Sequence, residues 1–296
     1  MELRVLLIAA LAAVLPMGLA RVLRAGGVSS EQGGACRPQC DAWRQRLAGA
    51  GPILGAAIAA RFALHGAWPG WPPHDAGEVL AWCTGGMLAS LVLPVLGWVA
   101  PVLLWATFAL EPYWSHHWVE SLPWLRTAGV AGAALLLGAA FQRGLGGGAG
   151  GTAWGADDGF GSRTLVLARE RAGLGGVVLG AALLLGNSTG SGALTLGALG
   201  LALASVTVDQ ALPGGERAWD GAALLGALAC AIVVQAVLYA SVPAGPAALL
   251  GCAAALLAWG PPSAGLMFLR SGVMLAATGL AVWWGWPEPD PYAGGW

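Results

Sequence analysis

Apolar runs long enough to cross a lipid bilayer recur along the whole chain. A bilayer core is about 30 Å thick, so a helix needs about 20 mostly apolar residues to span it. Of the 296 residues, 57% are hydrophobic and 10% are charged, whereas a soluble domain carries about 25% charged residues. We therefore expect an all-α, polytopic helical membrane protein with about ten transmembrane helices, within a range of about 8–11.

Glycine, proline and charged residues interrupt the apolar runs and so indicate where each predicted span begins and ends. The first apolar run, 5–20, is short, so a signal peptide cleaved near Ala20 competes with a genuine span. The run 78–110 is too long for one perpendicular helix, and Pro94, Gly97 and Pro101 divide it. Including these two halves, the further spans are expected near 47–65, 78–96, 98–112, 124–142, 173–186, 192–208, 221–241, 243–260 and 264–286.

A Gly-rich stretch divides the chain into two predicted domains. Residues 144–163 contain many glycines, a composition typical of a flexible linker. We expect an N-terminal membrane bundle over 1–143 and a C-terminal membrane bundle over 164–296, each with about five spans.

The arginines predict the orientation of the chain in the membrane. With about ten spans, Arg217 and the arginines of 21–46 and 143–171 fall on one side. The loops on the opposite side contain no arginine: 66–77, 111–123, 187–191 and 287–296. The positive-inside rule then places the arginine side in the cytosol. The formal net charge of −1 argues against a nucleic-acid partner, which requires a basic surface.

Cys36 and Cys40 lie together in the predicted polar loop 21–46. They could form a disulfide, supply two metal ligands or remain free. A zinc site requires four ligands, and no second Cys/His pair follows. A cytosolic loop is also in a reducing compartment. We therefore expect two free or loosely paired thiols. The other cysteines lie within apolar runs and are expected to be small core residues: Cys83, Cys230 and Cys252.

A polar, aromatic segment, 111–120, joins two of the predicted spans and is followed by Arg126. It contains two of the four histidines, but neighbouring histidines on a helix diverge and do not converge on one metal ion. Its tryptophans are typical of an anchoring belt at the membrane interface. The alternative is a lipid-headgroup site in which the planar guanidinium of Arg126 holds a phosphate. The candidate substrate-binding residues are Tyr113, Trp114, His116, His117 and Arg126.

Isolated polar groups elsewhere offer weaker signals. Arg61 and Arg270 lie inside or at the edge of predicted spans, where an arginine either snorkels to the interface or marks a functional site. Asn187-Ser188-Thr189 matches the glycosylation pattern but lies very close to two spans. No nucleophile elbow, metalloprotease motif or nucleotide-binding loop is present. We expect no catalytic residues, no metal site and no cofactor in this chain.

Two segments resemble a known family over about residues 20–145. A span that ends in arginines leads into a Cys-Arg-Pro-Gln-Cys loop, and a Pro-containing span that ends in Tyr-Trp is followed by Leu-Arg and an Ala-rich helix. The matching residues are Arg21, Arg24, Cys36, Arg37, Cys40, Pro101, Tyr113, Trp114, Leu125 and Arg126. This order is similar to the membrane portion of GPI ethanolamine phosphate transferase 3, the PIG-O type. The family has Cys-Arg-Glu-Glu where this chain has Cys-Arg-Pro-Gln.

The resemblance implies a role in GPI-anchor biosynthesis in the endoplasmic reticulum membrane. Such transferases add ethanolamine phosphate from phosphatidylethanolamine to the GPI precursor, using a lumenal domain with a zinc site and a Thr nucleophile. We expect this chain to be the membrane domain that holds the lipid-linked substrate for a lumenal catalytic domain or partner subunit. The alternatives are a small-solute membrane transporter, for which interrupted spans are typical, and a non-catalytic structural subunit of a membrane complex.

Overall fold

The computed structural model describes residues 2–27, 37–66, 159–186, 189–213, 242–256 and 264–286, with single positions at 78, 81 and 84 and between 225 and 237. Within these ranges all regular structure is helical, which confirms the all-α prediction. The six continuous helices are α1 (Glu2–Gly27), α2 (Arg37–His65), α6 (Phe160–Leu185), α7 (Gly190–Ala211), α9 (Ala244–Ala255) and α10 (Ala264–Gly285).

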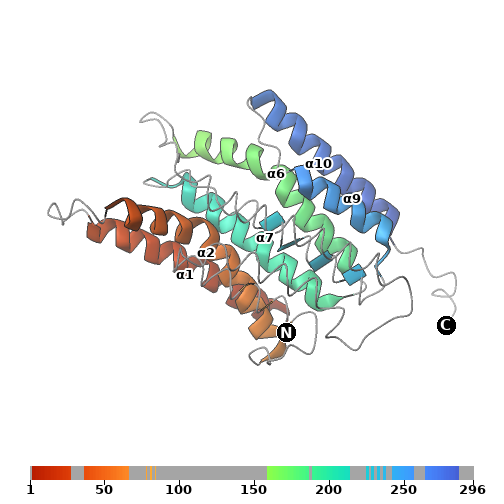
Figure 1. Cartoon of the computed structure of the whole chain (residues 1–296), viewed down its shortest axis with the longest axis horizontal. Coiled ribbons are helices and arrows are strands. Elements are labelled where there is room, and N and C mark those ends of the chain that lie inside the picture. Colours follow the sequence, from red (N-terminus) through yellow and green to blue (C-terminus); the bar gives the residue numbers. More distant parts are fainter. Residues whose placement is uncertain are drawn as a thin grey trace.

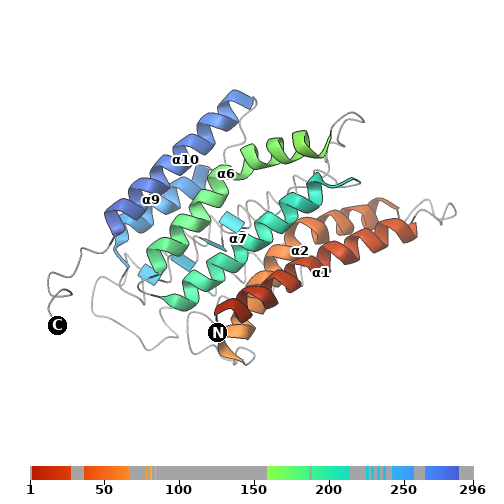
Figure 2. The same cartoon turned by 180° about the vertical axis from the view of Figure 1, so that it is seen from behind.

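The helices lie side by side with their axes roughly aligned, and consecutive helices such as α6 and α7 run in opposite directions. Figures 1 and 2 show α1 and α2 at one edge, α7 and then α6 beside them, and α9 and α10 at the other edge. The packing follows this order, because α1 and α2 both contact α7, α7 contacts α6, and α6 contacts α10. Helices from both predicted domains therefore pack together, although the proposed division at 144–163 stays a prediction.

Three helices of the described part are long and apolar enough to cross a membrane. They are Leu47–His65, Gly190–Ala211 and Gly265–Gly285, which match the spans expected at 47–65, 192–208 and 264–286. Shorter apolar stretches of described helix cover Ala10–Leu19 within α1 and Ala244–Ala254 within α9, inside the spans expected at 5–20 and 243–260. The spans predicted at 78–96, 98–112, 124–142 and 221–241 lie outside the continuous described ranges, so the total of about ten stays a prediction.

Several helices extend further than their apolar runs predicted. The loop expected at 21–46 is wrong in extent, because α1 continues to Gly27 and α2 already begins at Arg37. Cys40 therefore lies in the first turn of α2, whereas Cys36 lies outside the described residues. At the other predicted connection, α6 begins at Phe160, so the last residues of the linker 144–163 are helical. The end of α1 and the beginnings of α2 and α6 therefore contain polar residues that had been predicted to lie in loops.

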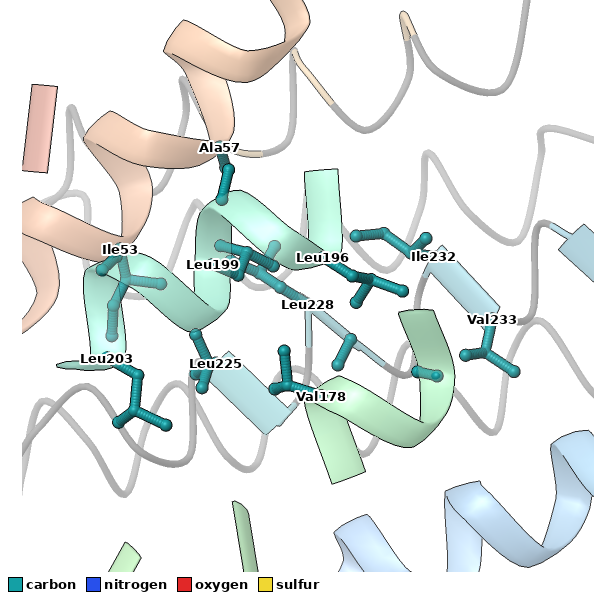
Figure 3. Close-up of a cluster of buried hydrophobic side chains, with 14 of the residues drawn as sticks. Ile53, Ala57, Val178, Leu196, Leu199, Leu203, Leu225, Leu228, Ile232 and Val233 are labelled. Atoms are coloured by element: carbon teal, nitrogen blue, oxygen red, sulfur yellow. The ribbon is translucent and has the colours of Figure 1, made fainter. Parts of the chain in front are cut away.

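The core is built from aliphatic side chains at helical spacing. On α6 the buried positions include Leu167, Arg171, Leu174, Val178, Ala181 and Leu185, which recur every three or four residues. On α7 they include Leu196, Leu199, Leu203, Val206 and Gln210. This spacing places each set on one face of its helix. Figure 3 shows these two faces meeting Ile53 and Ala57 of α2 and side chains at 225–233.

Glycines allow α1 and α2 to approach closely. A methyl group built at Gly55 of α2 would lie 2.8 Å from the backbone carbonyl oxygen of Ala12 on α1. One at Gly51 would lie 2.9 Å from the ring of Pro16. Neither position leaves space for a side chain without movement. In membranes such small residues permit the close helix packing that replaces the hydrophobic driving force.

The bundle has chemically different ends. The C-terminal end of α7 contacts Arg21 near the end of α1 and Arg171 in the first half of α6, and α6 contacts the beginning of α10 through Arg169. We call this the arginine end; it lies at the upper left of Figure 1. The opposite end of α10 exposes Trp283, Trp284 and Trp286. Arg4 and Arg61 also lie toward this second end, so the described arginines are concentrated at the arginine end but not confined to it. Exposed tryptophans at a helix end are typical of a membrane interface.

Candidate functional site

The arginine end contains a buried cation. Arg171 lies in the buried face of α6 and is only 5% exposed. Its Nη1 donates a hydrogen bond of 2.7 Å to the hydroxyl of Thr207, and its Nη2 donates to the side-chain carbonyl of Gln210. Both acceptors belong to the last turns of α7. Neutral oxygens thus partly compensate the cost of burying the charge, which would be high without partners.

A second arginine binds the same turn of α7 from the other side. The Nη2 of Arg21 lies 2.6 Å from a carboxylate oxygen of Asp209 and donates a longer bond, 3.3 Å, to the Asp209 backbone carbonyl. That carbonyl is among the last four of α7, which have no acceptor role inside the helix. Cations at a helix C-terminus also interact favourably with the helix dipole. Two arginines therefore converge on one helix end.

We refer to Arg21, Arg171, Thr207, Asp209 and Gln210 as the α7 polar cluster. Burial disfavours the charged guanidinium of Arg171, and the oxygens of Thr207 and Gln210 partly offset this cost. The hydroxyl of Thr207 also donates to the backbone carbonyl of Leu203 at 2.7 Å, which leaves its lone pairs for Arg171. The cluster can bind and orient charge, but it contains no nucleophile paired with a base.

Another arginine reaches from α6 to α10. The guanidinium carbon of Arg169 lies 5.4 Å from the centre of the Phe268 ring, within the range of a cation–π contact. One turn further along α10, the hydroxyl of Ser271 donates a long bond of 3.4 Å to the backbone carbonyl of Arg169. These contacts join the beginning of α10 to α6 at the arginine end.

The residues predicted from sequence to bind substrate lie outside the part of the chain that the structure describes. They are Tyr113, Trp114, His116, His117 and Arg126. The Asn187-Ser188 pair of the glycosylation pattern also lies outside it. The convergence of these side chains on a headgroup therefore stays a prediction.

Three further residues have a described position. Arg61 is half-buried near the end of α2, and Arg270 is half-buried in the second turn of α10. Both positions lie close to a helix end, which fits arginines that reach the interface. Cys252 was expected in the core, but it is an exposed free thiol on α9. The prediction was wrong because α9 is apolar on both faces, so sequence alone does not distinguish its buried side.

Sequence reasoning did not identify the burial of Arg171. It placed this residue among the loop arginines of 143–171, before the span expected near 173–186. A signal was present: extending the helix to Phe160 places Arg171 four residues after Leu167 and three before Leu174, on the buried face. Gln210 shows the same relation to Val206 on α7.

Among the described residues no three His, Cys, Asp or Glu side chains come close enough to hold a metal ion. The buried polar side chains of this part are Thr84, Arg171, Gln210, Ser271 and Thr278. No protein-family model matches the chain, no curated protein matches it and no solved structure matches it. The functional argument therefore depends on the residues of this chain.

Proposed function

We propose that this chain is an integral membrane protein of about ten spans that binds a phosphate-bearing lipid substrate. In its specific form, the proposal is the membrane domain of a GPI ethanolamine phosphate transferase in the endoplasmic reticulum. It would hold the lipid-linked GPI precursor or phosphatidylethanolamine for a lumenal catalytic domain outside these 296 residues. The substrate-binding segment would be 111–126.

The observation that carries the membrane part of the proposal is the polarity of the bundle along its axis. Three described helices have the length and hydropathy of a span. Of the arginines with described side chains, five lie toward one end (Arg21, Arg163, Arg169, Arg171 and Arg270). Arg4 and Arg61 lie toward the other end, where α10 exposes its tryptophans. By the positive-inside rule the arginine end faces the cytosol. With the predicted order of about ten spans, the segment 111–126 would face the lumen, where the catalytic domain of such a transferase acts.

The lipid part of the proposal is supported by the resemblance over 20–145 and by the residue types of the segment 111–126. Arg126 can hold two phosphate oxygens at once through its planar guanidinium. Trp114 and Trp118 suit the depth of a headgroup. A transporter would instead require a polar path between the spans, whereas the described core is mainly aliphatic.

Photo-cross-linking tests the proposed substrate directly. The purified chain is reconstituted in bilayers that contain a photoactivatable phosphatidylethanolamine or the matching phosphatidylcholine probe. We expect phosphatidylethanolamine adducts to concentrate in the peptide that contains 111–126 and to decrease in Arg126→Gln. Arg61→Gln, which removes an arginine outside this segment, serves as the control. Equal labelling by both probes, or labelling that Arg126→Gln leaves unchanged, would contradict the lipid-binding role.

A further inference from the structure

Each of the first two helices contains an interior proline. Pro16 lies inside α1, and Pro52 lies inside α2. Proline has no backbone N–H, so in each helix the carbonyl four residues earlier loses its helical donor. These carbonyls belong to Ala12 and Ala48. A helix that lacks an internal hydrogen bond bends more easily at that point, and proline is a common cause of such bends.

The two prolines lie at the same level of the α1–α2 pair. A methyl group built at Gly51, the residue before Pro52, would lie 2.9 Å from Cβ of Pro16. One built at Gly55 would lie 2.8 Å from the carbonyl oxygen of Ala12, which is the carbonyl that Pro16 leaves without a helical donor. Glycine is itself a weak helix former. Both helices are therefore weakened at one level.

The main hydrophobic core ends near this level. It includes Ala13 of α1 and, on α2, residues from Ala50 onward. Met17 and Leu47 lie beyond the prolines, toward the arginine end. These two side chains are also buried, but they do not belong to the main core. The part of α1 and α2 beyond the prolines is therefore attached less extensively than the part before them.

An ion pair joins α1 to α7 beyond the core. We call residues 17–27 and 37–49 the α1–α2 arm, which lies at the arginine end (Figure 1). Arg21 of the arm contacts Asp209 of α7, with 2.6 Å between Nη2 and a carboxylate oxygen. Both side chains are partly exposed, so solvent screens their attraction. Such a contact can break without unfolding of the core.

We propose that the α1–α2 arm is a hinged element that bends at the level of Pro16 and Pro52 and is held closed by the contact between Arg21 and Asp209. Opening of the arm frees the carboxylate and the backbone carbonyl of Asp209, whereas the core before the prolines keeps its packing. In hinge motions a few residues absorb the change in backbone angles, and the segments on both sides move as units. This device does not depend on the proposed substrate role of 111–126.

Distances between spin labels, measured by electron paramagnetic resonance in bilayers, test the hinge. One pair of labels is attached at Val22→Cys on the arm and Val208→Cys on α7, in a chain without other cysteines. Both positions are exposed and lie next to the ion pair. The control pair, Leu11→Cys and Leu201→Cys, uses exposed positions on the core side of the prolines. We expect a closed and a more distant population for the first pair and one narrow population for the control pair.

Two sets of variants separate the ion pair from the hinge. Asp209→Asn removes the carboxylate and should raise the ratio of open to closed molecules by up to about fivefold, which corresponds to about 1 kcal/mol for an exposed ion pair. The double variant Pro16→Ala/Pro52→Ala restores both helical donors and should decrease the open fraction. An unchanged distance for the control pair shows that each variant keeps its core.

Three results would overturn the proposal. A single, unchanged distance for the first pair in the original chain and in Asp209→Asn alike would show that the arm does not open. An open fraction that the double proline variant leaves unchanged would place the movement elsewhere. Equal movement of both label pairs would show that α1 moves as a whole and does not bend.

Discussion

Arg171 of α6 donates a hydrogen bond to Gln210 of α7 from a helix position that otherwise carries Leu, Val or Ala. The two residues continue the buried faces of an antiparallel helix pair joined by a short connection at 186–189. A polar pair in an otherwise aliphatic seam contributes to helix register as well as to stability, because any shift leaves a buried charge without its acceptor. We therefore expect this pair to favour one alignment of α6 and α7.

Replacing Gln210 with Leu should lower the free energy of unfolding by about 2 kcal/mol, because it removes a hydrogen bond to a buried cation. In the double variant Arg171→Leu/Gln210→Leu the charge is gone as well. We expect the double variant to lose less stability than the sum of the single variants, by at least about 0.5 kcal/mol. Denaturant titration in detergent micelles measures the free energy of unfolding of Gln210→Leu, of Arg171→Leu and of the double variant. Strict additivity would show that the pair is not coupled.

The bond between Arg21 and Asp209 should contribute much less. Its side chains are 44% and 21% exposed, and solvent screens a pair of this kind, so Arg21→Gln should cost less than about 1 kcal/mol. High salt should reduce the small difference between the variant and the original chain. The same unfolding titration at low and high salt checks this. A loss as large as that of Gln210→Leu would mean that Arg21 has a larger structural role than its exposure indicates.

Gly55 should tolerate no side chain. Gly55→Ala places a methyl group against the Ala12 carbonyl oxygen, 2.8 Å away before any movement, so we expect a loss of about 1–3 kcal/mol. Gly18 on α1 is the matched control, since a methyl group added there would meet nothing within 4 Å. Gly18→Ala should be neutral or stabilise by up to about 1 kcal/mol through helix propensity. Thermal unfolding that ranks the two variants in the reverse order would contradict the close approach of α1 and α2.

Arg126 provides a functional test of the segment 111–126. If it holds a lipid phosphate, Arg126→Lys should impair complementation of a cell that lacks this chain but retains the catalytic domain, because an ammonium group cannot bind two oxygens through a planar fork. His116→Gln should have a smaller effect. Surface display of GPI-anchored proteins, at matched protein abundance, is the measurement. Full complementation by both Arg126→Lys and Arg126→Ala would show that this segment only anchors the chain at the membrane interface.

The apolar runs were sufficient to predict the helical class and the positions of several helices. The runs 47–65, 192–208 and 264–286 each correspond to a long apolar helix, because a mostly apolar segment of this length has few alternatives to a helix in a bilayer. The helix ends were less predictable. α6 begins at Phe160 and α1 continues to Gly27, because a helix does not stop where hydropathy falls; polar residues continue it at the membrane surface.

The candidate site was harder to predict for a different reason. Hydropathy treats an arginine near an apolar run as the end of that run, so Arg171 was placed with the loop arginines of 143–171, outside the span expected near 173–186. Only the positions of Leu167 and Leu174 on the same helix face, combined with the partner Gln210 on α7, reveal its burial. Such a partner is 39 residues away in the sequence, and no local pattern identifies it.

The orientation of the bundle is tested most directly by cysteine labelling in intact microsomes. Gly161 at the arginine end and Trp286 at the tryptophan end are both exposed, so each can be changed to Cys in a chain without other cysteines. A membrane-impermeant maleimide added outside should label Gly161→Cys at once and Trp286→Cys only after permeabilisation, because the arginine end is expected to face the cytosol. Immediate labelling of both positions, or labelling of Trp286→Cys alone, would contradict a bundle that spans the membrane in this orientation.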